Sequence, residues 1–217
     1  MSAARGVADL RDRILRRFTG TTPQHELADW RLLGLDAERS RKLQRLLPAE
    51  PIPAAVLVPF VDRPEGMTVL LTERASQLAK HAAQISFPGG RLEPSDPDVA
   101  SAALREAREE IGLDPGRVEV FGYLPDHLVI SGYRVTPVLG LVTPPMEIAP
   151  NPDEVADVFE VPVEFFFDTA NHKARLRRVG DEDILLFDFP WRERNIWGAT
   201  AGMLLTLVRM TNEERRA

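Results

Sequence analysis

Apolar residues near the start of the chain recur at helical spacing. They stand three or four positions apart, with Arg and Asp residues between them, at Val7, Leu10, Ile14 and Phe18. This pattern predicts a helix with one buried face. Thr19–Pro23 ends the pattern, and a second helical stretch is predicted near 37–47, before Pro48. We expect these helices to pack on the rest of the protein or on a second subunit, and a lid over a substrate is the alternative.

The middle and the end of the chain alternate apolar runs with turn residues, a pattern typical of strands. The predicted strands are 54–61, 67–72, 85–88, 117–124 and 133–142. Asp62–Gly66 is the predicted hairpin turn between the first two. Farther on, we predict a helical turn at 163–167, a hairpin of 174–179 with 184–189, and an apolar helix at 196–210.

The segment 48–53 is rich in proline and marks a boundary in the chain. We therefore predict an N-terminal helical extension at 1–50 and one main domain at 51–217. A length of 217 residues suits one domain with an extension, and 44% hydrophobic residues suffice for a sizeable core.

Residues 97–111 are predicted to form a helix with an unusual charge pattern. Asp96 suits the position before the helix, and Gly112 suits the position just after it. At about 100° per residue, one arc of the helix is apolar and is expected to be buried. This arc holds Ala100, Ala103, Leu104, Ala107 and Ile111. Its neighbouring arc holds Glu106, Glu109 and Glu110.

Three carboxylates side by side on one short helix are unfavourable without a partner. Glu106 and Glu110 are like charges four residues apart, which destabilises a helix by about 0.2–0.5 kcal/mol. Arg105 can pair with Glu109 and offset part of the repulsion. A bound hard cation, Mg²⁺ or Mn²⁺, explains the remaining negative charge. The alternative is a charged helix face in contact with solvent.

Composition narrows the classes of function. The net charge of −6 argues against a broad nucleic-acid surface. The chain has no cysteine, which excludes disulfides and thiol catalysis. The N-terminus lacks the apolar run of a secretory signal, and the longest apolar stretch, 196–208, is too short to cross a bilayer. We expect a cytoplasmic protein that binds no membrane.

The helix and the turn before it resemble the Nudix box, G-x5-E-x7-R-E-U-x-E-E-x-G-U, where U is an aliphatic residue. The second half of the box is matched by Arg105, Glu106, Ala107, Glu109, Glu110, Gly112 and Leu113. The first half differs, because Asp96 stands where Glu is expected and one extra residue follows it. The resemblance covers about 54–210 and implies the Nudix fold, an α/β (α+β) arrangement of a mixed, largely antiparallel sheet flanked by helices.

The segment before the box resembles a second signature, LLTxRSx3Rx3Gx3FPGG, of the coenzyme A pyrophosphatase branch of this family. The matching residues are Leu70, Leu71, Thr72, Arg74, Phe87, Pro88, Gly89 and Gly90. Ala75, Ala79 and Ala83 stand where Ser, Arg and Gly are expected. This branch carries a similar extra residue and Asp in its box. The resemblance implies hydrolysis of coenzyme A or an acyl derivative to 3′,5′-ADP and 4′-phosphopantetheine or its acyl form.

The resemblance also implies roles for individual residues. Predicted metal ligands for Mg²⁺ or Mn²⁺ are Glu106, Glu109, Glu110 and a backbone oxygen near Gly90. Arg105 is expected to orient one of these acids, and the general base is a box glutamate or Glu154. Predicted substrate contacts are Arg74, Lys80, His81, Gly89 and Gly90. Glu154 as a solvated acid or a partner for arginine, and His81 as an ordinary surface histidine, remain alternatives.

Two other functions remain open at this stage. One keeps the chemistry and changes the substrate to ADP-ribose, a dinucleotide such as NADH, or a nucleoside triphosphate. Ala79 and Ala83 favour this alternative because they replace two signature residues. The other is a catalytically silent Nudix module that binds a nucleotide. The expected partner is a small-molecule nucleotide and not a nucleic acid, and a homodimer involving the N-terminal helices is an open alternative.

Overall fold

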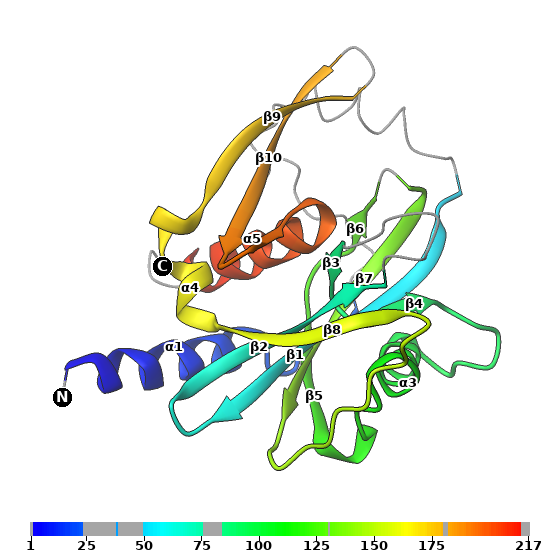
Figure 1. Ribbon diagram of the computed structural model, residues 1–217, viewed down its shortest axis with the longest axis horizontal. Coiled ribbons are helices and arrows are strands. Elements are labelled where there is room, and N and C mark those ends of the chain that lie inside the picture. Colours follow the sequence, from blue (N-terminus) through cyan, green and yellow to red (C-terminus); the bar gives the residue numbers. More distant parts are fainter. Residues whose placement is uncertain are drawn as a thin grey trace.

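The fold is seen in a computed structural model that describes residues 2–23, 38, 50–75, 84–129, 131–179 and 182–213 (Figure 1). The helices are α1 (Ser2–Phe18), α3 (Val99–Ile111), α4 (Val163–Phe167) and α5 (Gly198–Glu213). The strands are β1 (Ile52–Arg63), β2 (Gly66–Arg74), β3 (Ile85–Ser86), β4 (Gly89–Arg91), β5 (Val118–Tyr123), β6 (His127–Leu128), β7 (Tyr133–Val142), β8 (Val155–Pro162), β9 (Lys173–Val179), β10 (Glu182–Trp191) and β11 (Arg194–Ile196). Short 3-10 helices occupy Pro115–Arg117 and Thr169–Asn171.

Among the described residues, eight strands form one main sheet. Its central order is β3-β2-β1-β7-β5, while β4 pairs with β1, β6 with β7 and β8 with β2. Strands β1 and β7 run parallel, with Ile52 opposite Tyr133. The remaining pairs are antiparallel. The predicted fold class, a mixed and largely antiparallel sheet flanked by helices, is confirmed.

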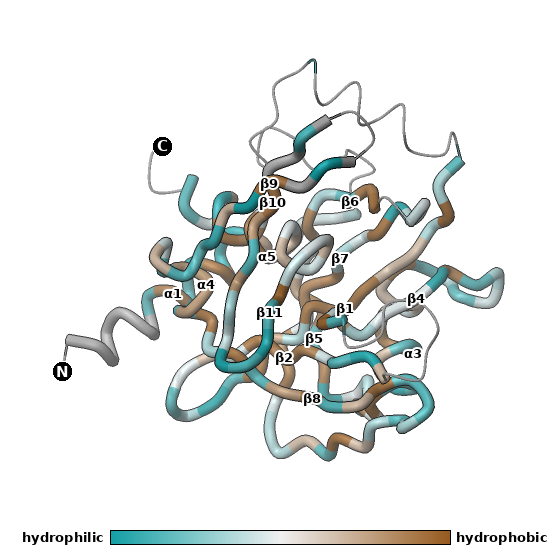
Figure 2. The backbone as a smooth tube through the Cα atoms, turned by 45° about the horizontal axis from the view of Figure 1, so that its top comes forward, coloured by the Kyte–Doolittle hydropathy of each residue, from teal (hydrophilic) through white to brown (hydrophobic). Residues whose placement is uncertain are grey.

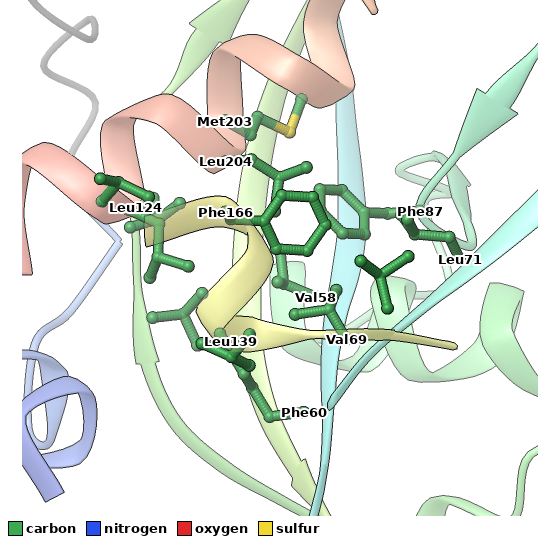
Figure 3. Packing of buried hydrophobic residues seen from close by; sticks show 14 of the residues in the cluster. Val58, Phe60, Val69, Leu71, Phe87, Leu124, Leu139, Phe166, Met203 and Leu204 are labelled. Carbon is green, nitrogen blue, oxygen red and sulfur yellow. The ribbon is translucent and has the colours of Figure 1, made fainter. Parts of the chain in front are cut away.

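Apolar residues line both faces of the sheet. On one face, Ala103, Ala107 and Ile111 of α3 pack against Leu57 of β1 and Val138 of β7. The other face is covered by α1, α4 and α5, and Figure 3 shows side chains of α4 and α5 gathered over the sheet. Hydrophobic colour follows β1 and β7 through the middle of the molecule in Figure 2. The sheet is therefore the centre of two cores, and α3 is held on its own face.

The N-terminal helix α1 contributes to the larger of the two cores, on the face of the sheet that α4 and α5 also cover. Leu10, Ile14 and Phe18 are buried, as the sequence pattern predicted. The chain after α1 is fixed to β5, where a Cβ on Gly122 would lie only 2.3 Å from the Phe18 carbonyl oxygen. Apart from Glu38, which is helical, the second predicted helix near 37–47 lies outside the described residues.

The sheet divides near its middle. The first half of β1 pairs with β4, where Ala55 lies opposite Gly90. Its second half pairs with β2, where Phe60 lies opposite Val69. On its other edge, β2 pairs with β8 from Thr68 to Arg74, and its carboxyl end also pairs with β3. The part of the sheet near α3 is therefore bordered by three segments: the end of β2, the start of β8, and β4.

Several predicted boundaries differ from the structure. Helix α3 begins at Val99, because Asp98 caps it by accepting the Ser101 N–H at 2.7 Å. The prediction that Asp96 is the cap is wrong, and its carboxylate binds Arg105 instead. Ile196 was expected in the last helix, but it belongs to β11 and pairs with Phe189 of β10. Helix α5 begins at Gly198.

A second sheet of three strands, β9 to β11, contains the predicted hairpin. Arg194 of β11 joins it to the main sheet by hydrogen bonds to Glu73 of β2 and Asp157 of β8. Its guanidinium also lies 4.4 Å from the centre of the Phe159 ring. In the described residues, no helix has both the length and the apolar character needed to cross a membrane.

Candidate functional site

The Gly89–Gly90 pair brings three elements into close contact. A Cβ on Gly89 would lie 2.4 Å from the Ala55 carbonyl oxygen of β1. On Gly90 it would lie 2.4 Å from Oε1 of Glu106 on α3. A side chain at position 89 would push β4 away from the backbone of β1, whereas one at position 90 would displace the Glu106 carboxylate. Glycine therefore permits the close approach of β4 to β1 at position 89 and leaves room for the Glu106 carboxylate at position 90.

Glu110 is a buried carboxylate, with only 7% of its surface exposed. Its Oε2 accepts a hydrogen bond from the Gly89 N–H at 3.2 Å. Burial raises the pKa of Glu110 to about 7, and the nearby Glu106 and Glu154 carboxylates add to this rise. The Gly89 N–H and Arg74 oppose it. The Gly89 N–H and the charge of Arg74 do not compensate for burial, so the site favours an additional positive charge beside Glu110.

Arg105 holds the outer side of the acidic cluster. It donates to Asp96 at 3.0 Å, to Glu106 at 2.9 Å and to Glu109 at 3.2 Å. Its Nη2 also donates to the carbonyl oxygen of Arg91 at 3.1 Å. The predicted Arg105–Glu109 pair is therefore present. The Arg105 guanidinium lowers the pKa of Asp96, whereas burial raises the pKa of Glu106 in spite of this arginine.

Arg74 and Glu154 lie where the end of β2 pairs with the start of β8. The Glu154 carbonyl oxygen accepts the Ala75 N–H at 2.9 Å, which fixes the start of β8 beside the end of β2. Its side chain accepts a hydrogen bond from Asn151 at 3.2 Å. The charges of Glu154 and Arg74 both affect the pKa of Glu110, which places the two side chains within electrostatic reach of it.

The structure thus gathers most of the predicted site residues around β4 and α3. Those brought together are Arg74, Gly89, Gly90, Arg105, Glu106, Glu110 and Glu154. Glu109 is at the periphery, where its side chain is 57% exposed and paired with Arg105. Lys80 and His81 lie outside the described residues.

The donor set fits a divalent cation in its chemistry. The site offers carboxylate oxygens from Glu106, Glu110 and Glu154, and Mg²⁺ and Mn²⁺ prefer such hard ligands. Burial raises the pKa of Glu106 and Glu110, repulsion from neighbouring carboxylates adds to the rise, and a bound cation would oppose both effects. Over the described part of the chain, no three Asp, Glu or His side chains converge into a preformed cage for an ion. The predicted metal roles therefore stay predictions.

Comparison with known proteins adds independent information. The NUDIX domain family model matches residues 51–181. A relative from Escherichia coli O7:K1, named as an uncharacterized Nudix hydrolase NudL, is 42% identical over 157 residues, which cover 71% of this chain and 80% of the relative. The same-named protein of Shigella flexneri is 39% identical over 187 residues, covering 83% and 96%. The solved NUDIX domain of Shewanella oneidensis NrtR, complexed with ADP ribose, is 15% identical with a TM-score of 0.47, covering 87% of this chain and 99% of that domain.

Proposed function

The chain belongs to the Nudix family, and from this premise we propose that it hydrolyses the diphosphate bond of coenzyme A or an acyl derivative with Mg²⁺ or Mn²⁺. The broader activity follows from the family, since its members are hydrolases that act on diphosphate bonds of nucleotide derivatives. The proposed products are 3′,5′-ADP and 4′-phosphopantetheine or its acyl form.

The position of Arg74 is the observation that supports coenzyme A. Among the signature residues, Leu70, Leu71, Thr72 and Phe87 are buried, so packing alone can explain them. Arg74 is half-buried, and its charge lowers the pKa of Glu110, an electrostatic effect that packing does not require. A guanidinium within electrostatic reach of the acidic cluster is suited to contact a diphosphate.

We assign the roles of the site residues as follows. The carboxylates of Glu106, Glu109 and Glu110, with a backbone oxygen near Gly90, hold the divalent ion. The chemistry that such an ion supplies is neutralisation of the diphosphate charge and activation of water. Arg74, Lys80 and His81 bind the substrate with the Gly89–Gly90 turn. Glu154 or a glutamate of α3 takes the proton of the attacking water.

A substrate panel tests the proposal. Coenzyme A, ADP-ribose and NADH are supplied at equal concentration with Mg²⁺ or Mn²⁺, and the products are separated by chromatography. We expect the highest kcat/KM for coenzyme A, with 3′,5′-ADP as a product and no turnover after chelation. A preference for ADP-ribose or NADH would favour the alternative substrates. Tight binding without turnover of any diphosphate would favour a silent module.

Arg105→Lys is expected to lower turnover by about 10- to 100-fold, the usual effect of removing a partner that orients metal ligands. Lysine keeps the charge but lacks the guanidinium fork that reaches Asp96 and Glu106 together. Steady-state kinetics measure the change. Arg108→Lys is the control, because Arg108 is exposed on the same helix. An Arg105→Lys enzyme with wild-type turnover would contradict the orienting role.

A further inference from the structure

Arg91, which has no acidic partner among the described residues, comes directly after the Gly89–Gly90 turn. Arg91 is exposed at the end of β4. Its Nε and Nη2 both donate to the hydroxyl oxygen of Tyr133, at 3.1 Å and 2.8 Å, and its guanidinium lies 5.5 Å from the centre of the Tyr133 ring. Within the described residues it makes no ion pair. The cation is therefore held in place while its charge remains available to a ligand.

The neighbouring arginines differ in this respect. Arg105 is shared among Asp96, Glu106 and Glu109. Arg134, which follows Tyr133, lies 3.5 Å from the buried carboxylate of Asp126. Of these three arginines, only Arg91 has a side chain whose contacts in the described part of the chain are all to an aromatic residue.

The fold places this cation next to the site but on the other face of the sheet. Successive side chains of a strand point to opposite faces. Gly90 faces Glu106 of α3, so Arg91 projects on the face where Tyr133 packs against the larger core. Strand β4 pairs only with β1 among the described strands. The other edge of β4 is therefore unpaired among the described strands, and it separates Gly90 from the Arg91 side chain.

We infer that Arg91, held by Tyr133, binds the 3′-phosphate on the ribose of a coenzyme A-type substrate. This inference rests on the proposed function. In coenzyme A, a single ribose separates the 3′-phosphate from the diphosphate. If the diphosphate lies at Gly90, the 3′-phosphate needs a cation about one ribose away, and Arg91 is the adjacent residue. Arginine is suited to phosphate, and a guanidinium already fixed by Tyr133 loses little entropy on binding.

The kinetic test compares coenzyme A with dephospho-coenzyme A, which lacks only the 3′-phosphate. Arg91→Ala is expected to lower kcat/KM for coenzyme A by about 10- to 100-fold, the range for a hydrogen bond to a charged group. The loss is expected in KM with kcat unchanged, because the 3′-phosphate does not react. For dephospho-coenzyme A the variant should equal the wild type. Tyr133→Phe keeps the ring but frees the guanidinium, so it should show a smaller loss confined to coenzyme A.

A binding test does not depend on turnover. Calorimetry with 3′,5′-ADP and 5′-AMP should show tighter binding of 3′,5′-ADP to the wild type and equal binding of the two to Arg91→Ala. Arg117→Ala, which changes an exposed arginine of the Pro115–Arg117 helix, is the control and should change neither assay.

The outcomes separate this inference from the proposed function. Suppose that the wild type hydrolyses coenzyme A, but Arg91→Ala lowers kcat/KM equally for coenzyme A and dephospho-coenzyme A, or for neither. The inference is then wrong and the proposed function stands. If the wild type hydrolyses neither substrate and binds 3′,5′-ADP no better than 5′-AMP, both are wrong. If it hydrolyses neither but binds 3′,5′-ADP more tightly through Arg91, only the proposed reaction is wrong.

Discussion

Glu110→Gln is expected to lower turnover by more than about 100-fold, since even the loss of a residue that orients metal ligands lowers activity by about 10- to 100-fold. Glutamine keeps the volume of Glu110 and can still accept the Gly89 N–H, but it supplies no negative charge. Steady-state kinetics with saturating Mn²⁺ measure the loss. Glu119→Gln is the matched control, because Glu119 is exposed on β5. A fully active Glu110→Gln enzyme would remove the metal-binding role from this residue.

The same substitution is expected to stabilise the metal-free protein above neutral pH. Burial raises the pKa of Glu110 to about 7, from an ordinary value of 4.5. The ionised carboxylate is therefore disfavoured by folding, and the penalty grows as pH rises from about 4.5 to about 7 and is constant above that. The shift corresponds to an order of about 3 kcal/mol. Below pH 4.5 the carboxyl is protonated in both the folded and unfolded states, and the penalty is absent.

Thermal melts in the presence of a chelator check this sign. At pH 8, Glu110→Gln should raise Tm by several degrees, given about 2–4 °C per kcal/mol for a protein of this size. At pH 4 the two proteins should melt together. A variant that loses both activity and stability at pH 8 would mean that the carboxylate has a structural role. Loss of activity with a gain in stability is the pattern of a group kept for function.

Local patterns in the sequence predicted the elements well. The helical spacing of Leu10, Ile14 and Phe18 predicted α1, and these side chains are buried as expected. Strands β1, β2, β3, β5 and β7 and the hairpin at β9–β10 followed from apolar runs and turns, whereas β4, β6, β8 and β11 were not predicted. These features depend on residues close together in the chain, so the sequence contains their signal.

The cap of α3 shows where local patterns are insufficient. Asp96 and Asp98 both suit a helix start, and the choice between them depends on Arg105, which is engaged with the Asp96 carboxylate nine residues away. The burial of Glu110 was missed for a related reason. The predicted arcs placed it at the edge of the apolar stripe, but the approach of Gly89 of β4 encloses it. Both outcomes depend on contacts between elements that periodicity does not encode.

The acidic trio was also only partly predictable. The sequence predicted three adjacent carboxylates, whereas the structure gives them different surroundings. Glu110 is buried, Glu106 accepts a hydrogen bond from Arg105 and lies close against Gly90, and Glu109 is largely exposed. Among them, Glu110 should therefore have the largest effect on stability when it is neutralised, and Glu109 the smallest.

Gly90→Ala is expected to lower turnover by more than about 100-fold with little change in stability. Its Cβ would lie 2.4 Å from Oε1 of Glu106, and that carboxylate is at the end of a flexible side chain that can rotate away. The fold then survives while Glu106 leaves its position. Gly89→Ala is the matched comparison, because its Cβ would meet the backbone of Ala55 and Val56 at 2.4 Å and 2.6 Å. Backbone cannot rotate away, so we expect a destabilisation of about 1–3 kcal/mol, the usual range for overpacking.

A double-mutant cycle identifies what Gly90→Ala acts upon. If the alanine acts only by displacing the Glu106 carboxylate, then Gly90→Ala combined with Glu106→Gln should be no slower than Glu106→Gln alone, because both changes remove the same interaction. Melting temperatures of all variants show that the proteins are folded under assay conditions. Fully additive losses would contradict this account and would show that Gly90 contributes through its own backbone, as expected of a carbonyl oxygen that binds the divalent ion directly.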